Sequence, residues 1–278
     1  MFSPAPGPIG IFDSGYGGLT IFDKIMEAMP GYDYVYLGDN ARSPYGPRSF
    51  EVVYRFTRQA VETLFNEGCQ LVILACNTAS AKALRTIQQR DLPQWDPERR
   101  VLGVIRPTVE LMDKISKSKH VGILGTNGTI TSGSYSMEIK KMFPHMTVTG
   151  EACPMWVPLV ENNEFASPGA DYFVRKHLEH ILAADPEIDT LVLGCTHYPL
   201  LIEKIKAFLP EGITLFSQGE YVAASLTDYL RRHPEMDIRL TKQGNCRFLT
   251  TESAAKFSDA ASVFLNHPVE VEQIRLVE

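Results

Sequence analysis

The sequence lacks an excess of basic residues, a hydrophobic stretch of membrane-spanning length and a recognisable export signal. Its 27 Lys and Arg against 33 Asp and Glu give a formal net charge of −6 at pH 7, so it has no basic footprint for nucleic acid. No apolar run approaches the roughly 20 residues that span a bilayer. The N-terminus, Met-Phe-Ser-Pro-Ala-Pro-Gly-Pro, has neither the basic nor the apolar region of a signal peptide. We therefore expect a cytoplasmic protein that binds neither nucleic acid nor a membrane.

The motifs that bind common cofactors are also missing. The chain has no Gly-x-Gly-x-x-Gly dinucleotide fingerprint and no Gly-x-x-x-x-Gly-Lys-Ser/Thr phosphate loop. It contains no Cys-x-x-Cys pair with zinc-ligand spacing and no Gly-x-Ser-x-Gly nucleophile elbow. Any chemistry is therefore expected to use protein side chains alone, with no cofactor and no metal.

The five cysteines are too few, too widely spaced and odd in number for a disulfide framework. In a cytosolic enzyme such thiols are expected to be reduced. They lie at Cys69, Cys76, Cys153, Cys195 and Cys246.

What the sequence does have is an alternation of short apolar runs with amphipathic segments. This pattern favours an α/β fold with mainly parallel sheets. It predicts strands over 9–13, 33–37, 70–75, 99–104, 120–124, 146–150, 190–194, 214–216, 245–250 and 269–271. It predicts helices over 19–29, 50–66, 78–89, 109–116, 132–142, 172–182, 198–208 and 220–231, with a loop over 91–100 and Asp171 as the cap of the helix over 172–182.

Two apolar runs end in the same way, with a cysteine followed by polar residues. Leu-Val-Ile-Leu-Ala leads to Cys76-Asn77-Thr78, and Leu-Val-Leu-Gly leads to Cys195-Thr196. Each run is typical of a buried parallel strand, and ligands bind beyond the carboxyl ends of such strands. A lone cysteine at this place is usually a small buried hydrophobe. Because the two runs lie about one domain length apart, we infer two structurally similar halves that bring both thiols to a shared cleft.

His197 makes Cys195 a stronger candidate for a catalytic residue. In an extended segment His197 and Cys195 point to the same side, where an imidazole can exchange a proton with the thiol. A metal site is the structural alternative, but Cys-x-His alone lacks the ligand number of a zinc site.

Four further segments are candidates for ligand binding, each with a plain structural interpretation beside it. Asp13-Ser14, followed by Gly-Tyr-Gly-Gly, comes between a strand and a helix and also suits helix capping. Tyr45-Gly46 lies in a Pro-rich loop whose composition is typical of an ordinary turn. Thr126 opens a turn before a helix, where hydroxyl and N–H groups suit a carboxylate or simple capping. Glu161 follows an apolar run, and most such glutamates are exposed.

Taken together, four of these blocks resemble bacterial glutamate racemases. They are Phe-Asp-Ser-Gly-Tyr-Gly-Gly-Leu from residue 12, Gly-Asp-Asn-Ala-Arg-Ser-Pro-Tyr-Gly from residue 38, Ala-Cys-Asn-Thr-Ala from residue 75 and Gly-Cys-Thr-His-Tyr-Pro-Leu from residue 194. The last block is the most specific, since related aspartate racemases typically carry another residue at position 197. The chain departs from the usual pattern at Tyr16, Asn40 and Gln218, and none of these removes a candidate catalytic group.

The resemblance implies two α/β domains that face each other across a central cleft, one formed by residues 1–105 with 216–278 and the other by residues 106–215. It implies cofactor-independent interconversion of L- and D-glutamate, which supplies D-glutamate for peptidoglycan. Cys76 and Cys195 would be the two acid/base residues. The assisting and substrate-binding residues implied in the same way are Asp13, Ser14, Tyr45, Gly46, Asn77, Thr78, Thr126, Glu161, Thr196 and His197. A homodimer is also expected.

Three other functions stay open on the sequence. A related amino-acid or hydantoin racemase, or a decarboxylase of the same superfamily, would keep the fold and change the pocket. A redox or metal-binding protein would use the same thiols differently. A binding module without catalysis would keep the cleft and leave the α-hydrogen of its ligand unexchanged.

Overall fold

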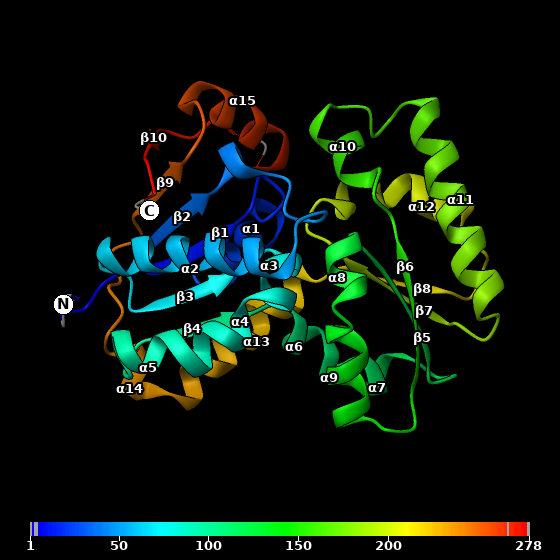
Figure 1. The fold of residues 1–278 in the computed structure, drawn as a ribbon, viewed down its shortest axis with the longest axis horizontal. Helices are drawn as coiled ribbons and strands as arrows, with labels where there is room; N and C mark the ends of the chain where they lie inside the picture. Colours follow the sequence, from blue (N-terminus) through cyan, green and yellow to red (C-terminus); the bar gives the residue numbers. More distant parts are fainter. Residues whose placement is uncertain (1, 3–4, 266, 277–278) are drawn as a thin grey trace.

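The computed structural model describes residue 2 and residues 5–265 and 267–276. Its strands form one six-stranded and one four-stranded sheet, which lie side by side as two lobes (Figure 1). Every strand pairing between the named strands of the described residues is parallel. The expected α/β class with parallel sheets is therefore confirmed. Among the described residues, no helix has both the length and the hydrophobicity to cross a bilayer.

The larger sheet has the order β10-β9-β2-β1-β3-β4. Its strands are β1 (Ile9–Asp13), β2 (Tyr34–Gly38), β3 (Leu71–Leu74), β4 (Arg100–Gly103), β9 (Cys246–Thr250) and β10 (Val271–Gln273). Its longer helices are α1 (Leu19–Ala28), α2 (Phe50–Asn66), α13 (Gly219–Arg232) and α15 (Ala254–Leu265), and α3 (Asn77–Lys82) is short.

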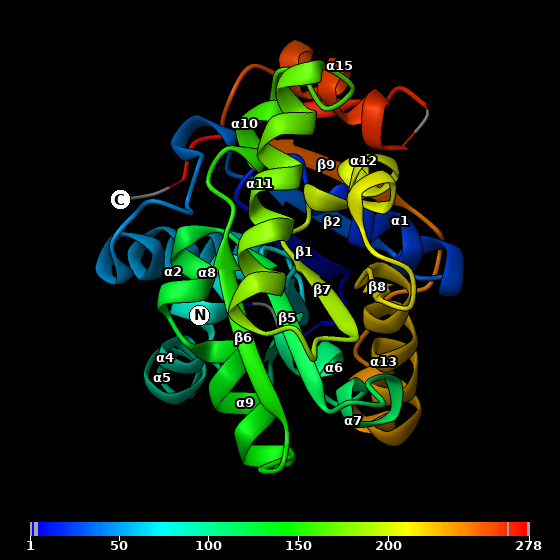
Figure 2. The same ribbon diagram turned by 90° about the vertical axis from the view of Figure 1, so that its right-hand side faces the viewer.

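The smaller sheet has the order β6-β5-β7-β8. Its strands are β5 (His120–Gly125), β6 (Thr147–Ala152), β7 (Thr190–Gly194) and β8 (Thr214–Phe216). The helices around it include α6 (Ile105–Val109), α7 (Met112–Ile115), α8 (Asn127–Thr131), α9 (Ser134–Met142), α10 (Trp156–Glu161), α11 (Pro168–Ala184) and α12 (Ile202–Phe208). The view turned by 90° shows α11 lying along this sheet (Figure 2).

Both faces of the larger sheet are covered at its central strands β1, β2 and β3, which explains why these strands are buried along their whole length. Successive side chains of a strand point to opposite faces. Ile9 and Ile11 of β1 therefore pack in one core cluster with α1, α13 and α15, whereas Phe12 packs in the other cluster with α2. β3 divides in the same way, with Ile73 in the first cluster and Val72 in the second.

The strand orders place two crevices at the carboxyl ends of the sheets. β1 lies between β2 and β3, and β5 lies between β6 and β7, so the chain winds in both directions from each of these central strands. Ligands bind at such switch points. Asp13 ends β1 and Cys76 follows β3, while Thr126 follows β5 and Cys195 follows β7. The fold thus delivers these four residues to the two crevices.

Some local predictions were wrong. The helix expected over 78–89 is broken into α3 and further short helical pieces that run on to Trp95, so much of the predicted loop over 91–100 is helical. Of the helix expected over 109–116, only α7 (Met112–Ile115) forms, and α6 already ends at Val109. Ser167, not Asp171, caps α11, because the Ser167 side chain accepts a hydrogen bond from the N–H of Ala170. The helices α6, α8, α10 and α15 were not predicted, and neither was the short helix α14 (Pro234–Asp237).

The domain limits expected from the sequence stay a proposal, which the strand order supports. All strands up to Gly103 and all strands from Cys246 onward belong to the larger sheet, and the strands between His120 and Phe216 form the smaller one. The outermost residues of the proposed first domain lie outside the described residues.

Candidate active site

A pocket lies where the carboxyl ends of strands from both sheets meet. Ten of the twelve residues predicted as site residues line it: Ser14, Tyr45, Gly46, Cys76, Asn77, Thr78, Thr126, Cys195, Thr196 and His197. The other two, Asp13 and Glu161, lie behind this lining. Gly15 donates its N–H to Asp13, and Glu161 bonds to His197. The structure therefore brings all of the predicted residues to one place.

The first thiol is buried between a hydroxyl and a carboxylate. Cys76 is the N-cap of α3, and its Sγ lies 3.4 Å from the N–H of Ala79 and 3.3 Å from Oγ of Ser14. Burial raises the pKa of the Cys76 thiol to about 12, and the nearby Asp13 carboxylate adds to this rise. Cys76 is therefore held as a neutral thiol at neutral pH.

The second thiol has a cationic neighbour. Sγ of Cys195 lies 3.9 Å from Nδ1 of His197, and Nε2 of the same ring lies 3.0 Å from Oε1 of Glu161. Burial by itself would lower the pKa of His197, but the hydrogen bonds to Cys195 and Glu161 outweigh it and raise that pKa to about 10. The His197 imidazolium therefore places a positive charge beside Sγ of Cys195.

The contact between Cys195 and His197 arises differently from the prediction. We expected an extended segment in which residues two apart share a face. β7 ends at Gly194 instead, and the backbone then turns, with His197 at φ −79° and ψ −27°. The turn, not strand alternation, brings the imidazole to the thiol.

The loop after β1 holds Asp13 near the opposite lobe, whose His197 and Glu161 act on its charge. Oδ2 of Asp13 accepts the N–H of Gly15 at 2.9 Å, and Oδ1 has no hydrogen-bond partner among the residues that the structure describes. Burial raises the pKa of Asp13, and His197 partly offsets that rise. Asp13 thus offers a hydrogen-bond acceptor close to both lobes.

Hydroxyl groups cluster on the side of the pocket formed by α3 and α8. Oγ1 of Thr78 lies 2.9 Å from Oγ1 of Thr126, and Thr129 lies within hydrogen-bond distance of both. Hydroxyls in such a cluster can reorient to donate to a carboxylate. Tyr45 is different, because its hydroxyl is already bonded to the Asp39 carboxylate. Tyr45 therefore presents its ring and backbone to the pocket.

The sequence reasoning missed a buried network behind the pocket. Nδ2 of Asn77 donates to Gln218 at 2.8 Å, and Tyr135 donates to Oδ1 of Asn77 at 2.6 Å. Nε2 of Gln218 lies 2.6 Å from Oγ1 of Thr108 and 2.8 Å from the Tyr135 hydroxyl. The network orients Asn77 and joins the lobes. Its only signal in the sequence was Gln218, noted as a departure from the family pattern.

The chain matches proteins of known family over nearly its whole length. Residues 9–233 match the family model described as Asp/Glu/Hydantoin racemase. A glutamate racemase of Shouchella clausii is 41% identical over 271 residues, which cover 97% of this chain and 94% of the relative.

Solved structures agree in fold. The glutamate racemase isoform RacE1 of Bacillus anthracis has a TM-score of 0.87 at 35% identity, covering 97% of this chain and 98% of that one. A glutamate racemase of Francisella tularensis in complex with D-glutamate has a TM-score of 0.86 at 30% identity, with 98% of each chain covered.

Gly17 generates a first prediction, because it lies directly against the site. A Cβ at Gly17 would be 2.4 Å from Nδ1 of His197 and from Oγ1 of Thr196. We expect Gly17→Ala to destabilise the fold by roughly 1–3 kcal/mol, as overpacking does. Gly31→Ala is the matched control, since nothing lies within 4 Å of its Cβ position, and its effect should stay within about 1 kcal/mol. Denaturant unfolding measures both, and equal stabilities of the two variants would contradict the expected crowding at Gly17.

The two thiols generate a second prediction, on alkylation. Both cysteines are 6% exposed, so their access is comparable and their ionisation should decide their reactivity. At pH 7–8, iodoacetamide should label Cys195 faster than Cys76, and His197→Asn should slow the labelling of Cys195. Peptide mass spectrometry over a time course measures both rates. Faster labelling of Cys76, or no effect of His197→Asn, would contradict the assignment of Cys76 as the neutral thiol and Cys195 as the thiol beside a cation.

Proposed function

The chain belongs to the Asp/Glu/Hydantoin racemase family, and from this membership we propose that it interconverts L- and D-glutamate with two cysteines as acid and base. We further propose that it needs no cofactor and that it supplies D-glutamate for peptidoglycan synthesis. The observation that carries the proposal is the pair of thiols, one from each sheet, that line a single pocket with opposite charges beside them.

Glutamate is the proposed substrate because the relatives at about 40% identity are glutamate racemases. The pocket suits the polar parts of an amino acid. The hydroxyls of Thr78 and Thr126 can donate to a carboxylate, and the buried Asp13 carboxylate behind the lining can attract the ammonium group.

Racemisation must remove the α-proton on one face of Cα and return a proton on the other. In one direction, the Cys195 thiolate accepts the α-proton, and the electron pair of the broken C–H bond stays on the substrate as a carbanion. The Cys76 thiol then donates its proton to the opposite face. The reverse direction begins with Cys76 as thiolate and Cys195 as thiol, so the two resting forms exchange through solvent.

The carbanion has no cofactor to spread its charge, so its stabilisation must come from donors fixed before reaction. Ser14, Asn77 and Thr196 lie beside the two thiols and are the proposed donors. The His197 imidazolium adds a positive charge next to Cys195, held in place by Glu161. Electrostatic stabilisation of this kind is worth more in a buried site than in water.

A homodimer and a cytoplasmic location stay predictions from the sequence. Sedimentation of the purified chain tests the first, and fractionation of cells that produce it tests the second.

The third prediction concerns the cysteines. Cys76→Ser and Cys195→Ser should each abolish nearly all racemisation of glutamate, because each lacks the acid/base of one face. Either variant should still eliminate a leaving group from a suitable β- or N-substituted analogue, which needs one base only. Cys246→Ser, at an exposed cysteine, is the control and should keep full activity. Circular dichroism follows the reaction, with D-aspartate and a hydantoin as competing substrates.

Racemisation by both active-site variants within about tenfold of the wild type, about 1.4 kcal/mol of barrier, would contradict the two-cysteine mechanism. Faster turnover of D-aspartate or the hydantoin than of glutamate would contradict the substrate assignment.

The fourth prediction concerns His197 and pH. Because the pKa of His197 is raised to about 10, the imidazolium persists at neutral pH and is lost as the pH rises through that value. His197→Asn removes this positive charge at every pH, whereas the wild type loses it only as the pH approaches 10. In the direction that begins at Cys195, the kcat of the variant should therefore fall further below that of the wild type at pH 7 than at pH 9.

The equilibrium constant between enantiomers is one, so kcat/KM must stay equal in the two directions. His197→Asn should consequently change the two kcat values unequally, with compensating changes in KM. Full pH profiles in both directions measure this effect. Unchanged profiles and turnover would show that His197 is only structural.

A further inference from the structure

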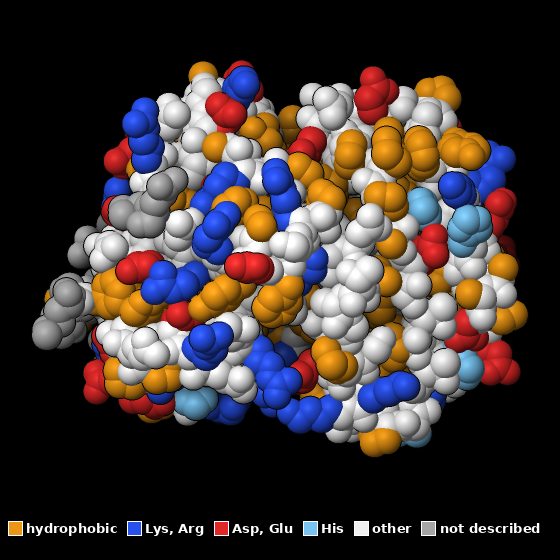
Figure 3. Space-filling view, viewed as in Figure 1, with side chains coloured by type: hydrophobic (Ala, Val, Ile, Leu, Met, Phe, Trp, Pro, Cys, Tyr) orange, Lys and Arg blue, Asp and Glu red, His pale blue; other side chains and the backbone are white. Residues whose placement is uncertain are grey.

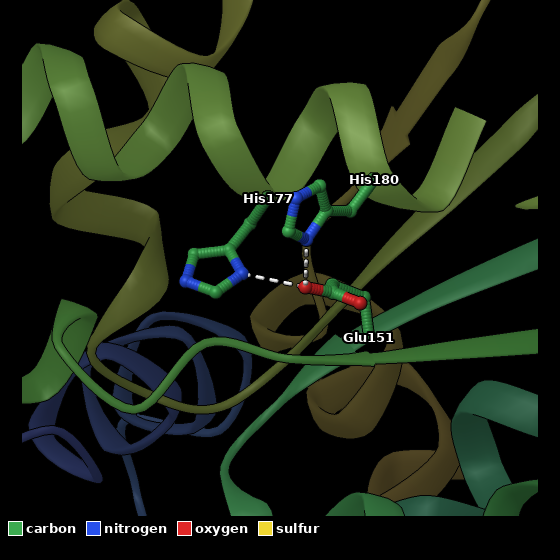
Figure 4. A group of neighbouring side chains, drawn as sticks. All are labelled: Glu151, His177 and His180. Carbon is green, nitrogen blue, oxygen red and sulfur yellow. Dashed lines mark hydrogen bonds and ion pairs between the residues drawn. The ribbon is translucent and has the colours of Figure 1, made fainter. Parts of the chain in front are cut away.

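A second cluster of titratable side chains lies in the smaller lobe (Figure 4), and none of its members lines the pocket. Glu151 belongs to β6, and His177 and His180 belong to α11. Nδ1 of His177 lies 2.6 Å from Oε1 of Glu151, and Nδ1 of His180 lies 3.5 Å from the same oxygen. All three donor atoms lie within 4.8 Å of one another. The two imidazoles thus converge on one carboxylate.

The helix and the strand explain this convergence. Residues three apart on a helix are neighbours on its surface, so His177 and His180 share the face of α11 that packs on β6. His177 is buried, with its ring at 6.2 Å and 76° from the ring of Trp156. His180 is largely exposed, and Glu151 is partly so. Figure 3 shows histidine side chains at the surface in the region of α11. The cluster is therefore held on its inner side and open on its outer side.

We propose that Glu151, His177 and His180 bind a divalent transition-metal ion such as Zn²⁺. Two imidazole nitrogens and one carboxylate oxygen suit zinc and its neighbours, which accept nitrogen ligands at about 2.0–2.2 Å. Mg²⁺ and Ca²⁺ prefer sites made of oxygen ligands alone. The exposed side at His180 leaves room for a water molecule as a fourth ligand.

Two other histidines show why this cluster differs from an ordinary ion pair. His145 bonds to Asp113 at 2.7 Å, and His120 lies between Asp185 and Glu187. Each of these groups offers one imidazole only. Among the described residues, Glu151, His177 and His180 form the group in which at least three potential metal ligands lie close enough together to share one ion.

A bound metal would link β6 to α11 just before the chain segment that connects β6 with Glu161. The chain runs from Glu151 through Cys153 into α10, whose last residue is Glu161, the partner of His197. Trp156 of α10 packs between His177 and Tyr198. The metal would therefore fix the elements that support Glu161 without touching the thiols. The ion takes no part in the racemisation proposed above, so the test of metal binding does not depend on racemase activity.

The test titrates the full chain with Co²⁺ and Zn²⁺. Cobalt absorption reports the ligands, since thiolate ligation at Cys76 or Cys195 would add an intense sulfur-to-cobalt band in the near ultraviolet. Competition with a chromophoric chelator gives the affinity, and thermal unfolding reports stabilisation by the bound ion. The variants are His180→Ala and Glu151→Gln. His145→Ala is the control, because it removes another exposed histidine that pairs with a carboxylate.

We expect the wild type and His145→Ala to bind one equivalent without the sulfur band and to gain thermal stability. Affinity should fall at least tenfold in both test variants, as is usual even for the loss of groups that only support metal ligands. His180 is exposed, so its replacement should not impair folding. Binding that His180→Ala retains in full, binding only with the sulfur band, or no binding below about 1 mM would overturn the proposal.

Discussion

His197 lies between the Cys195 thiol and the Glu161 carboxylate, and its positive charge makes the surroundings of Cys195 differ from those of Cys76. Burial alone would remove this charge, yet the bonds to Cys195 and Glu161 hold the pKa of the imidazole at about 10. On the other side, burial and the Asp13 carboxylate keep Cys76 protonated. The two thiols are chemically identical residues, but a cation lies beside Cys195 and a carboxylate lies near Cys76.

This asymmetry depends on the architecture. Parallel strands end at the same edge of a sheet, so each sheet delivers its polar residues to one crevice. Placing the two edges against each other puts Asp13 of one lobe close to His197 of the other, and Gly17 allows the close approach. The buried network of Asn77, Gln218 and Tyr135 joins the lobes behind the pocket. The site therefore forms only where the two lobes are in contact.

The α/β class and most strands could be predicted from the sequence, because buried parallel strands are short apolar runs with clear ends. β7 and β8, for example, have the predicted limits. Helix breaks were not predicted, since α6 and α7 depend on packing that a local pattern does not contain. The pairing of Cys195 with His197 was predicted for the wrong reason. The Gln218 network and the cluster of Glu151, His177 and His180 were missed because their members lie far apart in the chain.

The central claim is that two different groups, on opposite faces of Cα, remove and return the proton. The most direct measurement is racemisation of L-glutamate in D₂O, stopped early and analysed by mass spectrometry. Two bases predict that the D-glutamate formed carries deuterium at Cα while the remaining L-glutamate carries almost none. Product that retains the original hydrogen would mean that one group works on both faces, and would contradict the account.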